Sequence, residues 1–264
     1  SADVDCDGVS SEEDCNDFDA SLSSVLLDND CDGIANEEDS CPNDSLNDFD
    51  LDGICGDVDL ICNGTYIIDD VDTLGDLAVL AGCQEVSVHL IVRNTNLETL
   101  QGLEDLQAIG GILEVLNNSQ LETFQGLGSL ASVGGTISVQ GNAALQEVNA
   151  LSNLITHTSG LVISNNLSLQ HLDGLSSLNQ VGQEVLIQGN PSLTDLDGLL
   201  ALNSIGGYLH LGRNDCLVDV DGLAQLQTIG GNLSLQLNST LASTTGLSAL
   251  QSVGGAVLIE GNPM

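Results

Sequence analysis

The sequence predicts an all-β fold, a stacked parallel β-solenoid with 24-residue turns that follows an irregular acidic segment. Three observations predict it. One sequence pattern recurs at a constant spacing, apolar residues alternate with variable ones at the start of each copy, and acidic residues concentrate before residue 60. This shift in composition predicts two domains, residues 1–60 and residues 61–264.

The second domain repeats the pattern GG-x-L-x-I-x-x-N-x-x-L-x-x-L-x-G-L-x-x-L-x-x-I. An earlier copy near Val86 keeps only the later positions in register. A turn of this size cannot bury its own apolar face, so neighbouring turns must stack, with parallel strands ~4.8 Å apart. The regular copies begin at Gly110, Gly134, Thr158, Gly182, Gly206, Gly230 and Gly254.

Each copy combines two apolar periods. Leu113 and Val115 alternate with variable residues, which is the period of a strand with one buried face. The following apolar residues come every third position, which suits a chain that bends around a prism. We expect the glycine pairs to let the backbone turn tightly between segments. The spacing of three is seen in Leu121, Phe124, Leu127, Leu130 and Val133.

One polar column is as regular as the leucines. An Asn amide carries both donors and an acceptor, so stacked copies can bond to one another and to the backbone. We expect a buried ladder, and the alternative is a row of amides that bind a ligand. The column consists of Asn94, Asn118, Asn142, Asn166, Asn190, Asn214, Asn238 and Asn262.

The stretch C62-N-G-T-Y-I-I-D-D-V-D-T-L-G-D-L-A-V-L-A-G-C83, followed by the L-x-x-I-G-G-x-L-x-I-x-x-N-x-x-L turns, resembles the receptor L-domain family. Those domains form ligand-binding lobes of insulin- and EGF-receptor ectodomains and occur in bacterial secreted proteins. The resemblance covers residues 61–264. It implies a single-stranded right-handed parallel β-helix, with a Cys62–Cys83 disulfide that closes the N-terminal cap.

The first domain carries three D-x-D-x-D-G segments. Alternate carboxylates in a tight loop can converge on one Ca²⁺ ion, which takes six to eight oxygen ligands, and the glycine permits the bend. The residue after each glycine offers its carbonyl, and a further Asp stands at loop position 12. The resulting ligand sets are Asp3, Asp5, Asp7, Val9 and Asp14; Asp28, Asp30, Asp32, Ile34 and Asp39; and Asp48, Asp50, Asp52, Ile54 and Asp59.

An EF-hand normally has Glu at position 12 and flanking helices, which Cys and Pro disfavour here. The stretch C41-P-N-D-S-L-N-D-F-D-L-D-G-I-C55-G-D-V-D instead resembles thrombospondin type 3 repeats. The match is close over residues 28–59 and loose over residues 1–27. It implies three or more Ca²⁺ ions along an irregular, disulfide-stapled chain, with Asp57 among the ligands and Asp17 and Asp19 completing a further site. The alternative is a solvated acidic linker.

Eight cysteines fit this frame incompletely. Two pairs that span successive calcium loops, Cys41–Cys55 and Cys15–Cys31, are the next disulfide candidates. Cys6 and Cys216 have no evident partner. The spacings lack the C-x-x-C pairs of zinc sites.

The chain has 39 acidic residues against 2 basic ones, for a formal charge of −37. Such a surface repels phosphate backbones and anionic membranes, so we expect no nucleic-acid partner. No apolar run approaches the ~18 residues of a membrane span, so we expect no membrane insertion. The cysteines and the start at Ser1 favour a processed piece of a longer precursor, secreted to the extracellular space or the cell surface.

No pattern indicates catalysis, and we expect that the protein is not an enzyme. His157 replaces the Ile or Val of its column and is expected in the core. His210 is expected to point outward from a strand, beside Leu186 and Ser234, which offer no partner acid.

We therefore expect a structural or adhesive module with a calcium-stiffened stalk. The last copy ends at Met264 without a polar capping turn, which favours head-to-tail self-association, as in a filament, or a cell-surface or matrix partner. The alternative is a receptor-like module for a protein or carbohydrate ligand. Its outward positions vary between turns, and they include Thr136, Ser138, Gln140 and Ser164. Ice binding is disfavoured because those positions form no row of Thr.

Glycosylation sequons begin both inside and outside the Asn column. Those at Asn166 and Asn238 belong to the column and are expected to be inaccessible. The candidates for modification are Asn43, Asn63, Asn117 and Asn232.

Overall fold

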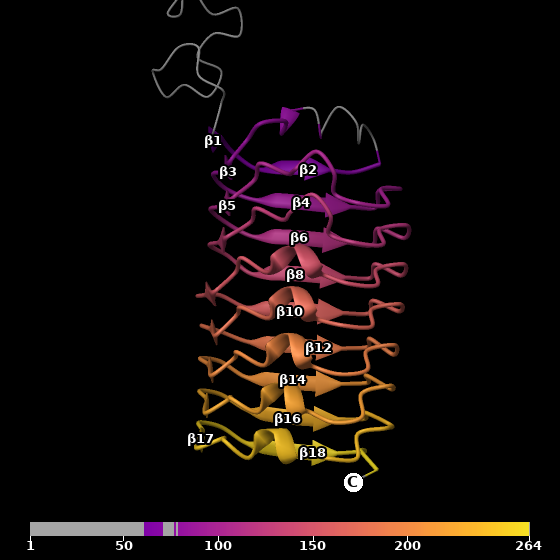
Figure 1. The fold of residues 1–264 in the computed structure, drawn as a ribbon, viewed down its shortest axis with the longest axis vertical. Helices are drawn as coiled ribbons and strands as arrows, with labels where there is room; N and C mark the ends of the chain where they lie inside the picture. The colour runs from indigo at the N-terminus through magenta and orange to yellow at the C-terminus, as the bar shows by residue number, and fades with distance from the viewer. Residues whose placement is uncertain (1–60, 71–76, 78, 264) are drawn as a thin grey trace, which may run out of the picture. The chain divides into compact units, whose positions relative to one another are not determined.

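The computed structural model describes residues 61–70, 77 and 79–263, all of which belong to the unit Ile61–Met264. The chain of this unit winds into a β-solenoid whose strands stack as parallel arrows (Figure 1). The predicted all-β parallel solenoid is therefore confirmed. Among the described residues, no helix is both long enough and apolar enough to cross a membrane.

The main face of the solenoid is a nine-stranded parallel sheet. Inward and outward side chains alternate along its strands, as the period of two predicts. From β6 onward neighbouring strands pair with the same offset as the sequence repeat, as in Leu113 with Ile137. The strands are β2 (Tyr66–Ile68), β4 (Leu90–Arg93), β6 (Leu113–Leu116), β8 (Ile137–Gln140), β10 (Leu161–Ser164), β12 (Val185–Gln188), β14 (Leu209–Gly212), β16 (Leu233–Gln236) and β18 (Val257–Glu260).

A second row of two-residue strands precedes the long strands in each turn. It forms two parallel sheets, of four and five strands, that separate between β7 and β9. The four-stranded sheet contains β1 (Ile61–Cys62), β3 (Glu85–Val86), β5 (Ala108–Ile109) and β7 (Ser132–Val133). The five-stranded sheet contains β9 (Thr156–His157), β11 (Gln180–Val181), β13 (Ser204–Ile205), β15 (Thr228–Ile229) and β17 (Ser252–Val253).

The glycine pairs lie at bends of the backbone, as predicted, and they also permit close stacking of the turns. None of the pairs has a positive φ. A Cβ at Gly134 would lie 2.1 Å from the Gly110 carbonyl oxygen of the preceding turn, and one at Gly182 would lie 2.2 Å from that of Thr158. Thr158 carries the Cβ that this approach excludes, which accounts for the separation of β9 from β7.

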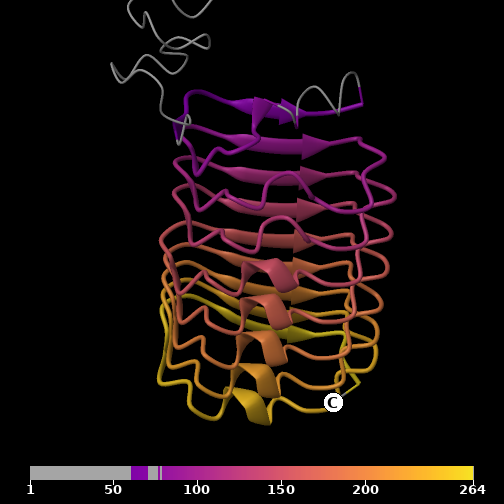
Figure 2. The ribbon, with the colours of Figure 1, turned by 45° about the horizontal axis from the view of Figure 1, so that its top comes forward.

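Short 3-10 helices stack into a third column in the later turns (Figure 2). Neighbouring helices in this column are in contact from η1 to η5. They occupy part of the stretch in which apolar residues recur every third position. The helices are η1 (Asn149–Leu151), η2 (Asp173–Leu175), η3 (Asp197–Leu199), η4 (Asp221–Leu223) and η5 (Thr245–Leu247).

The core is a set of apolar columns that run the length of the solenoid. Leu121, Phe124, Leu127 and Leu130 are fully buried, and each is stacked on its equivalents in the turns above and below. Burial of apolar surface contributes ~25 cal/mol per Å². The turns therefore stabilise one another through contacts that no single turn could make.

Candidate functional site

The predicted calcium ligands all lie outside the described residues, as do Cys15, Cys31, Cys41, Cys55 and Asn43. Their roles stay predictions. Among the residues that the structure describes, no group of three or more His, Cys, Asp or Glu side chains could hold a metal ion.

The N-terminal turn contains the disulfide that the resemblance implied. Cys62 and Cys83 are bonded to each other, and both are buried. Cys62 lies in β1 and pairs with Val86 of the next turn, so the bond ties the chain at the start of the solenoid to the first regular stack. Cys216 is exposed and has no disulfide partner in the described part of the chain.

The Asn column forms a continuous buried ladder. Asn118, Asn142, Asn166, Asn190, Asn214 and Asn238 are each 0% exposed. The Asn142 Oδ1 accepts from the Asn118 backbone N–H at 2.9 Å and from its Nδ2 at 3.1 Å. The Asn142 Nδ2 donates in turn to the Val115 carbonyl at 2.9 Å and to the Asn166 Oδ1 at 3.2 Å. The amides are thus engaged within the core, which excludes the alternative of a ligand-binding row.

The assignment of Asn94 to this ladder was wrong. Leu90 pairs with Leu113, so the offset between β4 and β6 is one residue shorter than in the later turns. The missing residue falls after the strand: Thr95 lies two residues before Leu97, whereas Asn118 lies three residues before Leu121. Thr95 therefore occupies the ladder position, is buried, and donates from its backbone N–H to the Asn118 Oδ1 at 2.9 Å. Asn94 is exposed with a φ of 54°.

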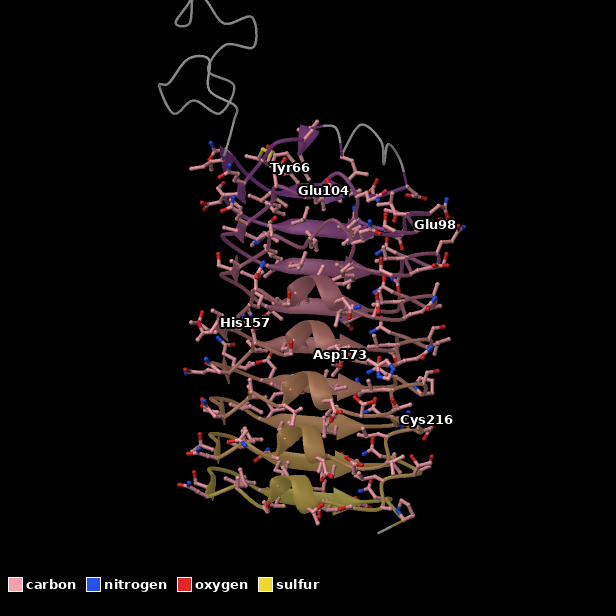
Figure 3. All side chains as sticks on the ribbon, viewed as in Figure 1. Tyr66, Glu98, Glu104, His157, Asp173 and Cys216 are labelled. Atoms are coloured by element: carbon pink, nitrogen blue, oxygen red, sulfur yellow. A yellow bond between two sulfur atoms is a disulfide. The ribbon has the colours of Figure 1, made fainter. Side chains whose placement is uncertain are left out.

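His157 lies in the core, as predicted, at the break between the two short-strand sheets. It is 2% exposed, and its Nε2 lies 3.0 Å from the Gly160 carbonyl oxygen. Its Nδ1 is buried without a hydrogen-bond partner. Burial lowers the pKa of His157 below 6.5 and outweighs the backbone of Gly160 and Val133, which raises it, so the imidazole is neutral at pH 7. Figure 3 shows it on the side of the short strands, away from Cys216.

The acidic residues of the 3-10 column stack with like charges in register. Asp173, Asp197 and Asp221 begin η2, η3 and η4. Asp197 is largely exposed, but partial desolvation raises its pKa, and the carboxylates of Asp195, Asp219, Asp173 and Asp221 raise it further. This surface is therefore locally repulsive at neutral pH.

The outer face of the long strands varies from turn to turn, as predicted. Ser138 and Ser164 were predicted to be outward but are 5% and 1% exposed. Gln140 bridges the two serines, donating to the Ser138 Oγ at 2.6 Å and accepting from the Ser164 Oγ at 3.0 Å. These small polar residues are part of the packing of the face.

A hollow of ≈ 390 Å³ opens on this face at the end of β14. Its polar wall is formed by Asn165, Gln188, His210, Arg213 and Gln236, and no lining residue is acidic. Gly212 leaves the space beside β14 that a side chain would fill. His210 is partly buried, and this burial lowers the pKa of its imidazole.

The sequence predicted that Gln188, His210 and Gly212 point outward, but it did not predict the hollow. The signal was available, because β14 reads Leu-His-Leu-Gly where β16 reads Leu-Ser-Leu-Gln, and Arg213 follows directly. What the sequence could not show is that Asn165 and Gln188, from two earlier turns, lie against the same space.

The sequons behave as the ladder predicts. Asn166 and Asn238 are fully buried, whereas Asn63, Asn117 and Asn232 are exposed.

Compared with models of known protein families and with curated protein sequences, the chain shows no significant match.

Proposed function

We propose that the protein is an extracellular, non-enzymatic structural or adhesive module, in which an acidic calcium-binding segment precedes a rigid solenoid. The observation that carries this proposal is the Asn ladder. Every buried amide from Asn118 to Asn238 is engaged with the adjacent turns. An interior devoted to stacking suits a body that holds its shape and presents its faces, rather than one that opens around a substrate.

The calcium proposal is supported by the three D-x-D-x-D-G loops and their resemblance to thrombospondin type 3 repeats. We expect calorimetry on the full chain to detect at least three sites. Chelation should leave the β-sheet signal of the solenoid intact, because its core is apolar and independent of metal. The absence of calcium binding at millimolar concentration would reject this part of the proposal.

Assembly of copies along the solenoid axis belongs to the same proposal. The regular stack supports it, because copies of one chain carry matching parallel strands along the same axis. The charge of −37 opposes association, so calcium should promote it. Light scattering of the full chain with and without calcium tests this. A monomer in both conditions would restrict the proposal to adhesion through another partner.

A receptor-like binding module is the second candidate function. The observation that favours it is the outer face of the long strands, which differs between turns and carries the hollow at β14. A purely structural repeat needs no such local departure. Loss of partner binding on substitution at β14, with the fold intact, would separate this function from a scaffold.

A further inference from the structure

We infer that the hollow at β14 binds the carboxylate and hydroxyl groups of a uronic acid sugar, either free or as a residue of an acidic polysaccharide. This inference rests on the second candidate function, the binding module, and names the class of its ligand; the proposed scaffold needs no small ligand.

Two departures from the repeat coincide at this place. In the column of Gly212, the turns on either side carry Gln188 and Gln236, and in the column of His210 the next strand carries Ser234. The Ser234 Oγ donates to the Gln236 Oε1 at 3.0 Å, which closes that turn on itself. In β14 neither partner of this bond exists, so the surface is open there.

The glycine and the histidine depend on each other. A Cβ at residue 212 would lie 2.6 Å from the His210 Nε2, so the imidazole extends along β14 into space that only glycine leaves free. The pair thereby opens the hollow and places a ring nitrogen in its wall.

The wall holds polar groups without protein partners. Among the described residues, the side chains of Asn165, Gln188, His210 and Arg213 have no hydrogen bond to the protein. The corresponding backbone donors are satisfied, since Asn165, Gly189 and Arg213 donate to the carbonyls of the next turn at 2.9–3.0 Å. The free groups are thus side chains, and they converge on one space.

The single positive charge of Arg213, in a strongly acidic protein, favours a ligand with one negative charge. The chain has 2 basic side chains. Arg93 pairs with Asp69 at 3.2 Å, while Arg213 has no ion pair within the described residues. A guanidinium binds a carboxylate through two parallel hydrogen bonds. A dianion such as phosphate would be repelled more strongly by a protein of charge −37.

The rest of the wall suits hydroxyl groups. The amides of Asn165 and Gln188 both donate and accept, as a sugar hydroxyl requires. A hollow of ≈ 390 Å³ accommodates a monosaccharide. Leu237 is the one large apolar side chain in the lining, which gives little surface for the apolar side chains of a peptide.

The test is calorimetric titration of the full chain, in constant calcium, with glucuronate, glucose, acetate and an acidic dipeptide. We expect glucuronate to bind with a Kd on the order of 1 mM and the other three to bind at least about 10-fold more weakly. A tighter Kd per residue for an oligo-uronide would identify the polysaccharide as the source, and an equal value would identify the free sugar. No binding of glucuronate, or stronger binding of glucose or the dipeptide, would overturn the inference.

Two variants localise the binding. Arg213→Gln removes the charge, and we expect it to weaken glucuronate binding at least about 10-fold. The double variant His210→Ser, Gly212→Gln copies the sequence of β16, so it should fold while closing the hollow and removing binding. Arg93→Gln is the matched control, since it removes the other arginine and should bind as the wild type does. Unchanged binding in Arg213→Gln, or in a double variant with unaltered melting temperature, would also overturn the inference.

Discussion

The Asn ladder and the His157 position are two buried polar regions of one solenoid with opposite outcomes. In the ladder, each amide meets an identical amide one turn away, so the donors and acceptors of Asn142 all have partners. At His157 the neighbouring turns present Val133 and Val181, and the Nδ1 has no partner. A repeat protein tolerates a polar core group when the repetition supplies its partner. A single departure leaves the group orphaned, and here it coincides with a break in the short-strand sheet.

The largest expected effect is at the ladder. Asn142→Ala should lower the free energy of unfolding by about 1–3 kcal/mol, because it removes the partner of the Asn118 N–H and a donor to the Val115 carbonyl in the preceding turn. Denaturant unfolding of the full chain measures this loss. Gln146→Ala, an exposed substitution in the same turn, is the control and should change stability by less than about 0.5 kcal/mol. Equal behaviour of the two variants would contradict the ladder.

Replacing the buried polar side chain of His157 by an apolar one should raise the free energy of unfolding, whereas Asn142→Ala lowers it. His157→Val restores the column of Val133 and Val181 and removes the orphaned Nδ1, so we expect a gain of about 1 kcal/mol. The Gly160 carbonyl keeps a partner in the Ile137 N–H at 3.0 Å. A loss of stability would show that the imidazole is better accommodated than its contacts indicate.

The histidine also makes stability depend on pH. Burial lowers the pKa of His157, so as the pH falls the unfolded chain binds the proton first. The stability that depends on a neutral His157 is fully present above about pH 6.5 and is lost as the pH falls below it. Melting curves between pH 5 and 8 should therefore show a smaller acid-induced decline for His157→Val than for the wild type, with His210 responsible for part of what remains.

A smaller effect on stability is expected at Asp197, where the stacked turns bring like charges close together. The raised pKa of Asp197 means that the folded chain takes up this proton before the unfolded chain, so the ionised carboxylate destabilises the fold at neutral pH. Asp197→Asn should raise stability by no more than about 0.5 kcal/mol, because the site is solvent-exposed. The difference from wild type should shrink in high salt, and a difference independent of salt would exclude charge repulsion as its cause.

The smallest expected effect is glycosylation of asparagines on the surface. In a host that glycosylates Asn, glycopeptide mapping should find sugars only at Asn43, Asn63, Asn117 and Asn232. Asn166 and Asn238 are fully buried, so modification there requires the ladder to open. A glycan at either ladder position on folded protein would contradict the buried ladder.

The sequence by itself determined the solenoid. A constant repeat period, with apolar positions that alternate and then recur every third residue, predicted stacked parallel strands, inward leucine columns and the ladder from Asn118 onward. These features are predictable because each turn repeats the same burial pattern, and the pattern is visible in one dimension. His157 in the core followed from the same columns.

Only the tertiary structure decided where the repeat departs from itself. The shortened offset between β4 and β6 put Thr95 in the ladder in place of Asn94, which counting back three residues from Leu97 could not detect. The glycine pairs proved to be sites of close approach between turns, and the hollow required Asn165, which follows β10, to meet side chains of β12, β14 and β16. Each of these depends on contacts across the stack. The sequence period reports which face a residue takes, but the distance to the neighbouring turn is set by packing in three dimensions.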